Sequence, residues 1–115
     1  MSMTALIHTN STGNIIIQLK GSLDYEYSGT LHKEIEEILA EHPASMVTLD
    51  LYFLEFVGSS GIGSFVNTVA KLNQKRVCVE LSNVQPEFMK VFKLYKQYDI
   101  TQVIQCSEDG LSDAA

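Results

Sequence analysis

Hydrophobic positions in the first third of the chain change from strand-like runs to helical spacing. Two runs rich in β-branched residues, 5–9 and 15–19, flank the polar segment 10–14, whose asparagine, serine, threonine and glycine are typical of a turn. This pattern predicts a β-hairpin. Apolar residues then recur at intervals of three and four between 31 and 39, with glutamates on the other faces. They predict an amphipathic helix that ends before Pro43.

The rest of the chain alternates between short apolar runs and helical patterns. Strands are predicted at 46–51 and 77–81, because both segments are short, apolar and bounded by polar residues. An apolar stripe that starts at Ile62 predicts a second helix of three or four turns, and Pro86 suits the first turn of a third. Segment 101–105 is predicted as a last short strand.

The predicted order of elements is β-β-α-β-α-β-α-β, which places the chain in the α/β class. Two opening strands followed by alternating strands and helices imply a mixed β-sheet. We expect its parallel neighbours to be joined by right-handed crossovers and its helices to cover mainly one face. A single domain is predicted for residues 1–115. Its packed core is expected over about residues 4–106, and 107–115 are expected to form a flexible tail.

Charge and composition narrow the classes of function. A net charge of -6 argues against nucleic-acid binding, because nucleic-acid binders usually carry a basic stripe. The chain has neither an apolar run long enough to cross a bilayer nor the profile of a signal peptide, so we expect a cytoplasmic protein without direct membrane insertion. Cys78 and Cys106 have no metal-binding or redox spacing, and the histidines form no ligand pair. We expect neither a metal nor another cofactor.

Candidate chemistry is concentrated in the segment 58–63, Gly-Ser-Ser-Gly-Ile-Gly, between a predicted strand and a predicted helix. A hydrolase elbow, G-x-S-x-G, does not match, because Gly58-Ser59-Ser60-Gly61 is one residue too short. A phosphate-binding P-loop would need a lysine after its last glycine, and the dinucleotide fingerprint has a different glycine spacing. The sequence therefore predicts no catalytic residues and no enzyme.

Two interpretations of the serine pair remain. Ser59 or Ser60 can act as the N-cap of the following helix, which contributes on the order of 1 kcal/mol. Alternatively, one of them accepts a phosphate, which adds about -1.5 to -2 charge at the positive end of a helix. The fold should tolerate such a charge while the surrounding surface changes sharply, a combination that suits a binding switch.

The segment 50–63, Asp-Leu-Tyr-Phe-Leu-Glu-Phe-Val-Gly-Ser-Ser-Gly-Ile-Gly, resembles the signature of STAS domains, the bacterial anti-sigma factor antagonists. Agreement extends to residues 21–24 and 81–88 and covers roughly residues 4–106. The resemblance implies a mixed sheet backed by helices on one side. It also implies a non-catalytic role in partner switching, in which the unphosphorylated antagonist binds an anti-sigma factor that is also a serine kinase.

By match of position, the resemblance makes Ser59 the residue that this kinase phosphorylates and a serine phosphatase restores, with Ser60 as the second choice. Phosphorylation then abolishes binding to the kinase. We expect the partner-binding surface to combine the turn before the first helix with the start of the second helix. Its predicted residues are Ser22, Asp24, Tyr25, Gly58, Ser59, Ser60, Gly61 and Ile62.

Gly58 departs from the family, which commonly has aspartate directly before the acceptor serine. The departure leaves open a protein that is never phosphorylated or is read by an atypical kinase. A second alternative is a STAS subunit that regulates a membrane transporter through an ATP-binding cassette partner. A third is a small anion or nucleotide sensor that uses the loop 58–63, although this loop has no basic residue.

Overall fold

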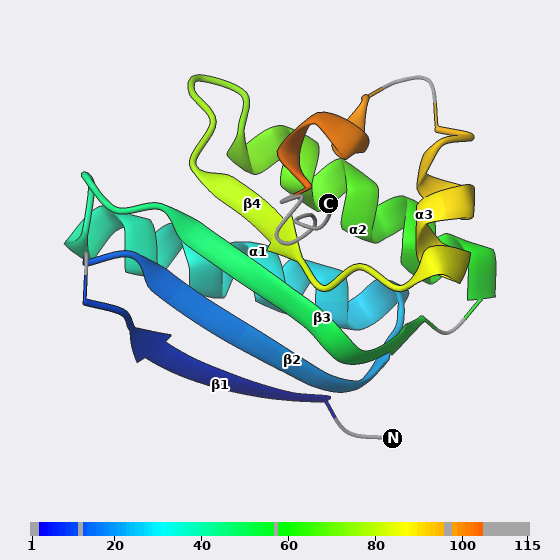
Figure 1. Cartoon of the computed structure of the whole chain (residues 1–115), viewed down its shortest axis with the longest axis horizontal. Helices are drawn as coiled ribbons and strands as arrows, with labels where there is room; N and C mark the ends of the chain where they lie inside the picture. Colours follow the sequence, from blue (N-terminus) through cyan, green and yellow to red (C-terminus); the bar gives the residue numbers. More distant parts are fainter. Residues whose placement is uncertain (1–2, 12, 57, 96–97, 105–115) are drawn as a thin grey trace, which may run out of the picture.

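A four-stranded mixed sheet forms the centre of the computed structural model, which describes residues 3–11, 13–56, 58–95 and 98–104. The strands follow one another across the sheet in chain order, β1-β2-β3-β4. β1 pairs antiparallel with β2, whereas β2, β3 and β4 are parallel (Figure 1). The bounds are Met3–Thr9 for β1, Ile15–Leu23 for β2, Val47–Phe56 for β3 and Val79–Ser82 for β4.

Three α-helices connect and follow the parallel strands: α1 (Tyr25–Glu41), α2 (Gly58–Leu72) and α3 (Pro86–Phe92). α1 and α2 lie side by side on the same face of the sheet (Figure 1). The predicted opening hairpin, the alternation that follows it and the one-sided arrangement of the helices are therefore confirmed. Pro86 occupies the first turn of α3 as predicted. Proline is suited to this position, because a backbone N–H in the first turn would have no intrahelical acceptor.

The core lies between the sheet and these helices. In β2 the side chains alternate between buried and less buried positions from Ile15 to Leu19, because successive residues of a strand point to opposite faces. The buried residues from the strands and helices form one hydrophobic cluster. Its fully buried large members include Ile17, Leu19, Leu23, Leu31, Ile35, Leu49, Leu51, Leu54, Phe65, Leu81 and Phe92.

The predicted last strand at 101–105 is wrong. A 3₁₀ helix, η1 (Ile100–Val103), occupies this segment, and strand character is limited to one parallel bridge between Leu81 and Ile104. The Asp99 carboxylate accepts hydrogen bonds from the backbone N–H and the hydroxyl of Thr101, which favours a tight turn over an extended chain. Residue 105 and the predicted tail 107–115 lie outside the described residues.

Candidate functional site

The serine pair lies in the first turn of α2. β3 ends at Phe56 and α2 begins at Gly58, so Ser59 and Ser60 are the second and third residues of the helix. The capping interpretation is therefore corrected, because an N-cap residue precedes the first helical residue. The first turn of α2 contains no acidic residue, and its backbone N–H groups lack intrahelical acceptors. This end of the helix favours an anion.

Gly61 allows the start of α2 to lie against the turn between β2 and α1. A Cβ atom at this buried position would lie 2.8 Å from the backbone oxygen of Leu23 and 3.5 Å from the Cα atom of Asp24. Any side chain would therefore force the two segments apart. Because Gly61 has no side chain, the start of α2 can lie close to the β2–α1 turn. These are the two segments predicted to share one partner-binding surface.

Asp24 has a structural function in the turn between β2 and α1. It is the N-cap of α1, and its Oδ1 accepts a hydrogen bond from the backbone N–H of Tyr27 at 2.8 Å. The Ser28 hydroxyl donates to the Asp24 carbonyl oxygen at 3.4 Å. Ser22 is half-buried and lies beside Glu55 in the β2–β3 pairing. Tyr25 is the first residue of α1. The capping bond stabilises this turn beside α2.

The residues predicted to bind a partner differ in their exposure. Ser60 is exposed, Ile62 is half-buried against the core, and Gly61 is buried. Ile62 and Gly61 therefore contribute mainly to packing, whereas Ser60 offers a hydroxyl to the surface. Gly58 and Ser59 lie beside it in the first turn of α2.

Polar side chains outside the predicted site form hydrogen bonds to the middle of β3. The β2–β3 register shifts between Gln18 and Lys20, and next to this irregularity Oδ1 of Asp50 accepts a hydrogen bond from the Tyr52 backbone N–H at 3.0 Å. Gln85 donates from Nε2 to the Tyr52 carbonyl oxygen at 3.0 Å. Gln85 lies in segment 81–88, where the sequence resembles STAS domains. The sequence carries no other sign of a role for Gln85.

An aromatic cluster fixes the point where β3 leads into α2. Phe56, the last residue of β3, makes edge-on contacts with Phe65 of α2 and Phe88 of α3, at centroid distances of 5.4 and 4.7 Å. Phe92 lies 6.1 Å from Phe56 in the same orientation. Such pairs each contribute about 0.5–1.5 kcal/mol beyond their buried area. Packing of Phe56 therefore anchors the end of β3 that precedes the serine pair.

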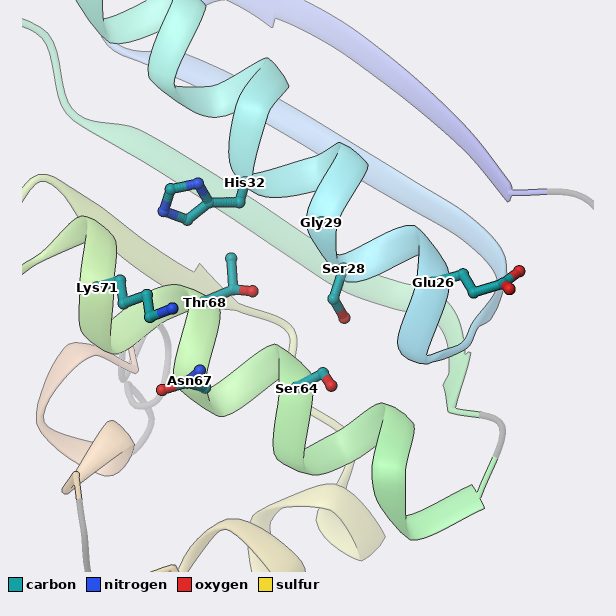
Figure 2. Close-up of a pocket in the computed structure, with 8 residues that line it drawn as sticks. All are labelled: Glu26, Ser28, Gly29, His32, Ser64, Asn67, Thr68 and Lys71. Carbon is teal, nitrogen blue, oxygen red and sulfur yellow. The ribbon is translucent and has the colours of Figure 1, made fainter.

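A polar groove of about 370 Å³ opens between α1 and α2, beyond the turn that holds Ser60. Figure 2 shows Ser28 and Thr68 projecting into the gap between the two helices, and both residues are buried. His32 of α1 and Lys71 of α2 also line the groove, and Nδ1 of His32 lies 3.5 Å from a carboxylate oxygen of Glu36. No local pattern in the sequence indicates this groove, because only helix packing brings its two sides together.

The basic side chains of this groove lie apart from the glycine–serine loop in which the anion-sensor alternative placed its ligand. Lys71 is in the last turn of α2, whereas the loop residues open the same helix. Among the residues that the structure describes, none of the helices combines the length and apolar character needed to cross a membrane.

Comparisons with known proteins identify the family of the chain. The STAS domain family model matches residues 6–109. The anti-sigma F factor antagonist of Paenibacillus polymyxa is 27% identical over an alignment of 93 residues, which covers 76% of this chain and 80% of that protein.

Two solved structures share the fold, the first of them from Bacillus. The cell fate determinant SpoIIAA in its phosphorylated form has a TM-score of 0.61 at 19% identity and covers 89% of each chain. The anti-sigma factor antagonist SpoIIAA in its unphosphorylated form has a TM-score of 0.58 at 21% identity, over 80% of this chain and 84% of the other.

Proposed function

The chain belongs to the STAS domain family, and on that premise we propose that it is a cytoplasmic, non-catalytic anti-sigma factor antagonist that acts by partner switching. The observation that carries the proposal is the serine pair in the first turn of α2, which follows the strand of the family signature. Similarity to an anti-sigma F factor antagonist supports the same class of function. The proposed partners are an anti-sigma factor serine kinase and a serine phosphatase.

Ser59 is the proposed phosphate acceptor, with Ser60 as the second choice. A phosphate in the first turn of α2 interacts favourably with the free backbone N–H groups and with the positive end of the helix dipole. The folded state therefore accommodates the modification. A partner surface that packs against this turn acquires an unpaired dianion instead, which costs desolvation and repulsion. Phosphorylation therefore abolishes binding to the partner while the domain stays folded.

The neighbouring turn between β2 and α1 completes the proposed contact surface. Gly61 allows this turn to lie close to α2, and the Asp24 cap stabilises the turn. A partner that covers the start of α2 therefore also meets Ser22 and the first residues of α1. A preorganised surface of this kind loses little conformational entropy on binding.

Phosphate mapping tests the proposal. The chain is incubated with its anti-sigma factor kinase and Mg-ATP, and the modified residue is located by mass spectrometry. We expect one phosphate on Ser59, which is absent from Ser59→Ala and present in the matched control Ser60→Ala. A phosphate on Ser60 would move the acceptor by one residue, and an unmodified protein would contradict the switch. Recovery with a transporter ATPase in place of the kinase would favour the transporter alternative.

Binding measurements separate the switch from a folding defect. Calorimetry should show that Ser59→Asp weakens binding to the kinase at least 100-fold, equivalent to about 2.7 kcal/mol. Its melting temperature should stay at or slightly above that of the unmodified chain, because an acidic residue in a first helical turn stabilises by about 0.3–1 kcal/mol. Gly58→Asp restores the residue common in the family. Faster phosphorylation of that variant would show that Gly58 weakens recognition by the kinase.

A further inference from the structure

The outer edge of β1 is unpaired in the part of the chain that the structure describes. β1 pairs with β2 along its whole length, from Met3 opposite Gly21 to Thr9 opposite Ile15, and no described strand lies on its other side. Alternate N–H and C=O groups therefore point outward along this edge. Natural sheets usually block such an edge with lysine, proline or a bulge, and β1 contains none of these. The edge is open to another extended chain.

A groove of about 600 Å³ runs between this edge strand and α1. Ala5 and Ile7 line it from β1, opposite the buried residues Leu19 and Ile17 of β2, and they therefore face the helix layer. Ile7 remains 54% exposed, which means that α1 leaves this part of the strand uncovered. Ile38 of α1 adds to the apolar floor of the groove.

The helix side of the groove is acidic. Glu34, Glu37 and Glu41 line it from α1, together with Tyr27, and no lysine, arginine or histidine is among the lining residues described. The spacing of three and four places the glutamates on one face of the helix, where like charges repel. The Tyr27 hydroxyl donates to Glu34 at 3.5 Å. Glu37 and Glu41 are exposed, so a ligand can reach their carboxylates.

We propose that β1 and this acidic groove bind an extended, basic segment of a partner protein by strand addition. Backbone hydrogen bonds to the free edge of β1 hold the segment as a fifth strand. Because side chains of a strand alternate, every second residue of the added strand faces α1. Lysine or arginine at those positions pairs with the glutamates. Apolar residues at the intervening positions lie beside Leu6, which is 49% exposed on the opposite face.

A second copy of this chain is a poorer occupant. Antiparallel pairing of two β1 strands about a two-fold axis would bring the two α1 helices, with their glutamates, to the same junction. The only titratable side chain that β1 supplies is His8, which pairs across from Ile16 and so points to the face away from α1. Residues 105–115 contain three acidic residues and no basic residue, so this segment also lacks the required charge.

This site is independent of the proposed phosphorylation switch. α1 packs against α2 on one side, while the groove lies on its other side, along β1 (Figure 1). A modification at the start of α2 does not alter the free edge or the three glutamates. Binding at the edge strand is therefore expected in Ser59→Asp as in the unmodified chain.

Strand addition is tested with the full chain and synthetic peptides. An eight-residue peptide that alternates lysine and valine is titrated into the labelled protein and followed by NMR. An alternating glutamate–valine peptide is the control. We expect the basic peptide alone to bind, to shift resonances of β1 and α1, and to slow hydrogen exchange of outward-pointing β1 amides. Absence of binding, or binding without protection of these amides, would overturn the proposal.

Matched charge reversals on α1 distinguish this groove from general attraction to an acidic protein. Glu37→Lys should weaken binding about fivefold or more. Glu36→Lys makes the same charge change on the neighbouring residue, which contacts His32 and does not line the groove, and should weaken binding less than twofold. Equal effects of the two variants would contradict the site. A micromolar dimer that Leu6→Lys dissociates would assign the edge to a second copy instead.

Discussion

The side-chain amide of Asn83 donates a hydrogen bond to Oδ1 of Asp50 at 2.9 Å, joining the residue after β4 to the signature strand β3. The same carboxylate oxygen accepts the backbone N–H of Tyr52 at 3.0 Å. Asn83 has a φ of 55°, in the left-handed region that asparagine tolerates better than most residues. One carboxylate thus controls the irregularity of β3 and the loop that leads into α3.

Breaking this link should destabilise the protein. Asp50→Ala is expected to lower the free energy of unfolding by about 1–2 kcal/mol, because it removes the acceptor for two donors. A double-mutant cycle of Asp50→Ala with Asn83→Ala, measured by urea unfolding, should give a coupling energy of about 1 kcal/mol. Strictly additive effects would show that the hydrogen bond contributes nothing.

Replacement of Asn83 separates its hydrogen bond from its backbone conformation. Asn83→Gly loses the amide but adopts a positive φ readily, whereas Asn83→Ala loses the amide and is strained. Asn83→Ala should therefore be less stable than Asn83→Gly by about 1 kcal/mol in the same urea experiment. A more stable alanine variant would contradict a left-handed conformation at this position.

Gly61 and Gly29 should respond in opposite directions to alanine. A Cβ at Gly61 would lie 2.8 Å from a backbone oxygen, whereas a Cβ at Gly29 meets nothing within 4 Å. Gly61→Ala is expected to destabilise by about 1–3 kcal/mol, because the start of α2 must move away from the β2–α1 turn. Gly29→Ala is expected to stabilise by about 0.5–1 kcal/mol through helix propensity. Thermal unfolding of both variants checks the pair.

Asn73 connects the end of α2 to β4 through its buried side chain. Its Oδ1 accepts from the backbone N–H groups of Cys78 and Val79, each at 2.9 Å. Its Nδ2 donates to the Val79 carbonyl oxygen at 3.1 Å and to the Tyr98 hydroxyl at 3.2 Å. Asn73→Ala should lower the free energy of unfolding by about 2–4 kcal/mol, since buried backbone groups lose their partners.

The neighbouring residue supplies the control for Asn73. Gln74 is exposed, and Gln74→Ala should change the free energy of unfolding by less than about 0.5 kcal/mol. Denaturant unfolding of both variants gives the comparison. Similar values for the two would mean that the Asn73 side chain does not hold β4.

The Cys78 thiol should make stability depend on alkaline pH. Burial raises the pKa of Cys78, an effect that the Arg76 guanidinium opposes, and the thiol donates to the Leu72 carbonyl oxygen at 3.2 Å. Because the folded pKa is above the unfolded one, this stabilisation is complete below the unfolded pKa and is lost as pH rises through the folded pKa. In a Cys106→Ser background, stability should therefore fall above about pH 8.5. Cys78→Ala should reduce this pH dependence.

Local patterns in the sequence carried enough information for most elements. Period-two and period-3.6 hydrophobicity located the hairpin and the first two helices, because burial of one face is a property of each segment. The serine pair and its glycines could also be found from the sequence, because they form one contiguous segment. Segment 101–105 was misassigned because an apolar, β-branched composition suits a strand and a buried turn equally well. The Asp99 hydrogen bonds to Thr101 favoured the turn.

What the sequence by itself determined is the element order up to α3, the Pro86 helix start, the family signature and the position of Ser59 in it. Tertiary structure alone decided that Gly61 touches Leu23, that Asp50 meets Asn83, and that an acidic groove follows the free edge of β1. Each of these relationships joins residues from different elements. Periodicity specifies which face of an element is buried, whereas the distance between two elements depends on how their side chains pack together.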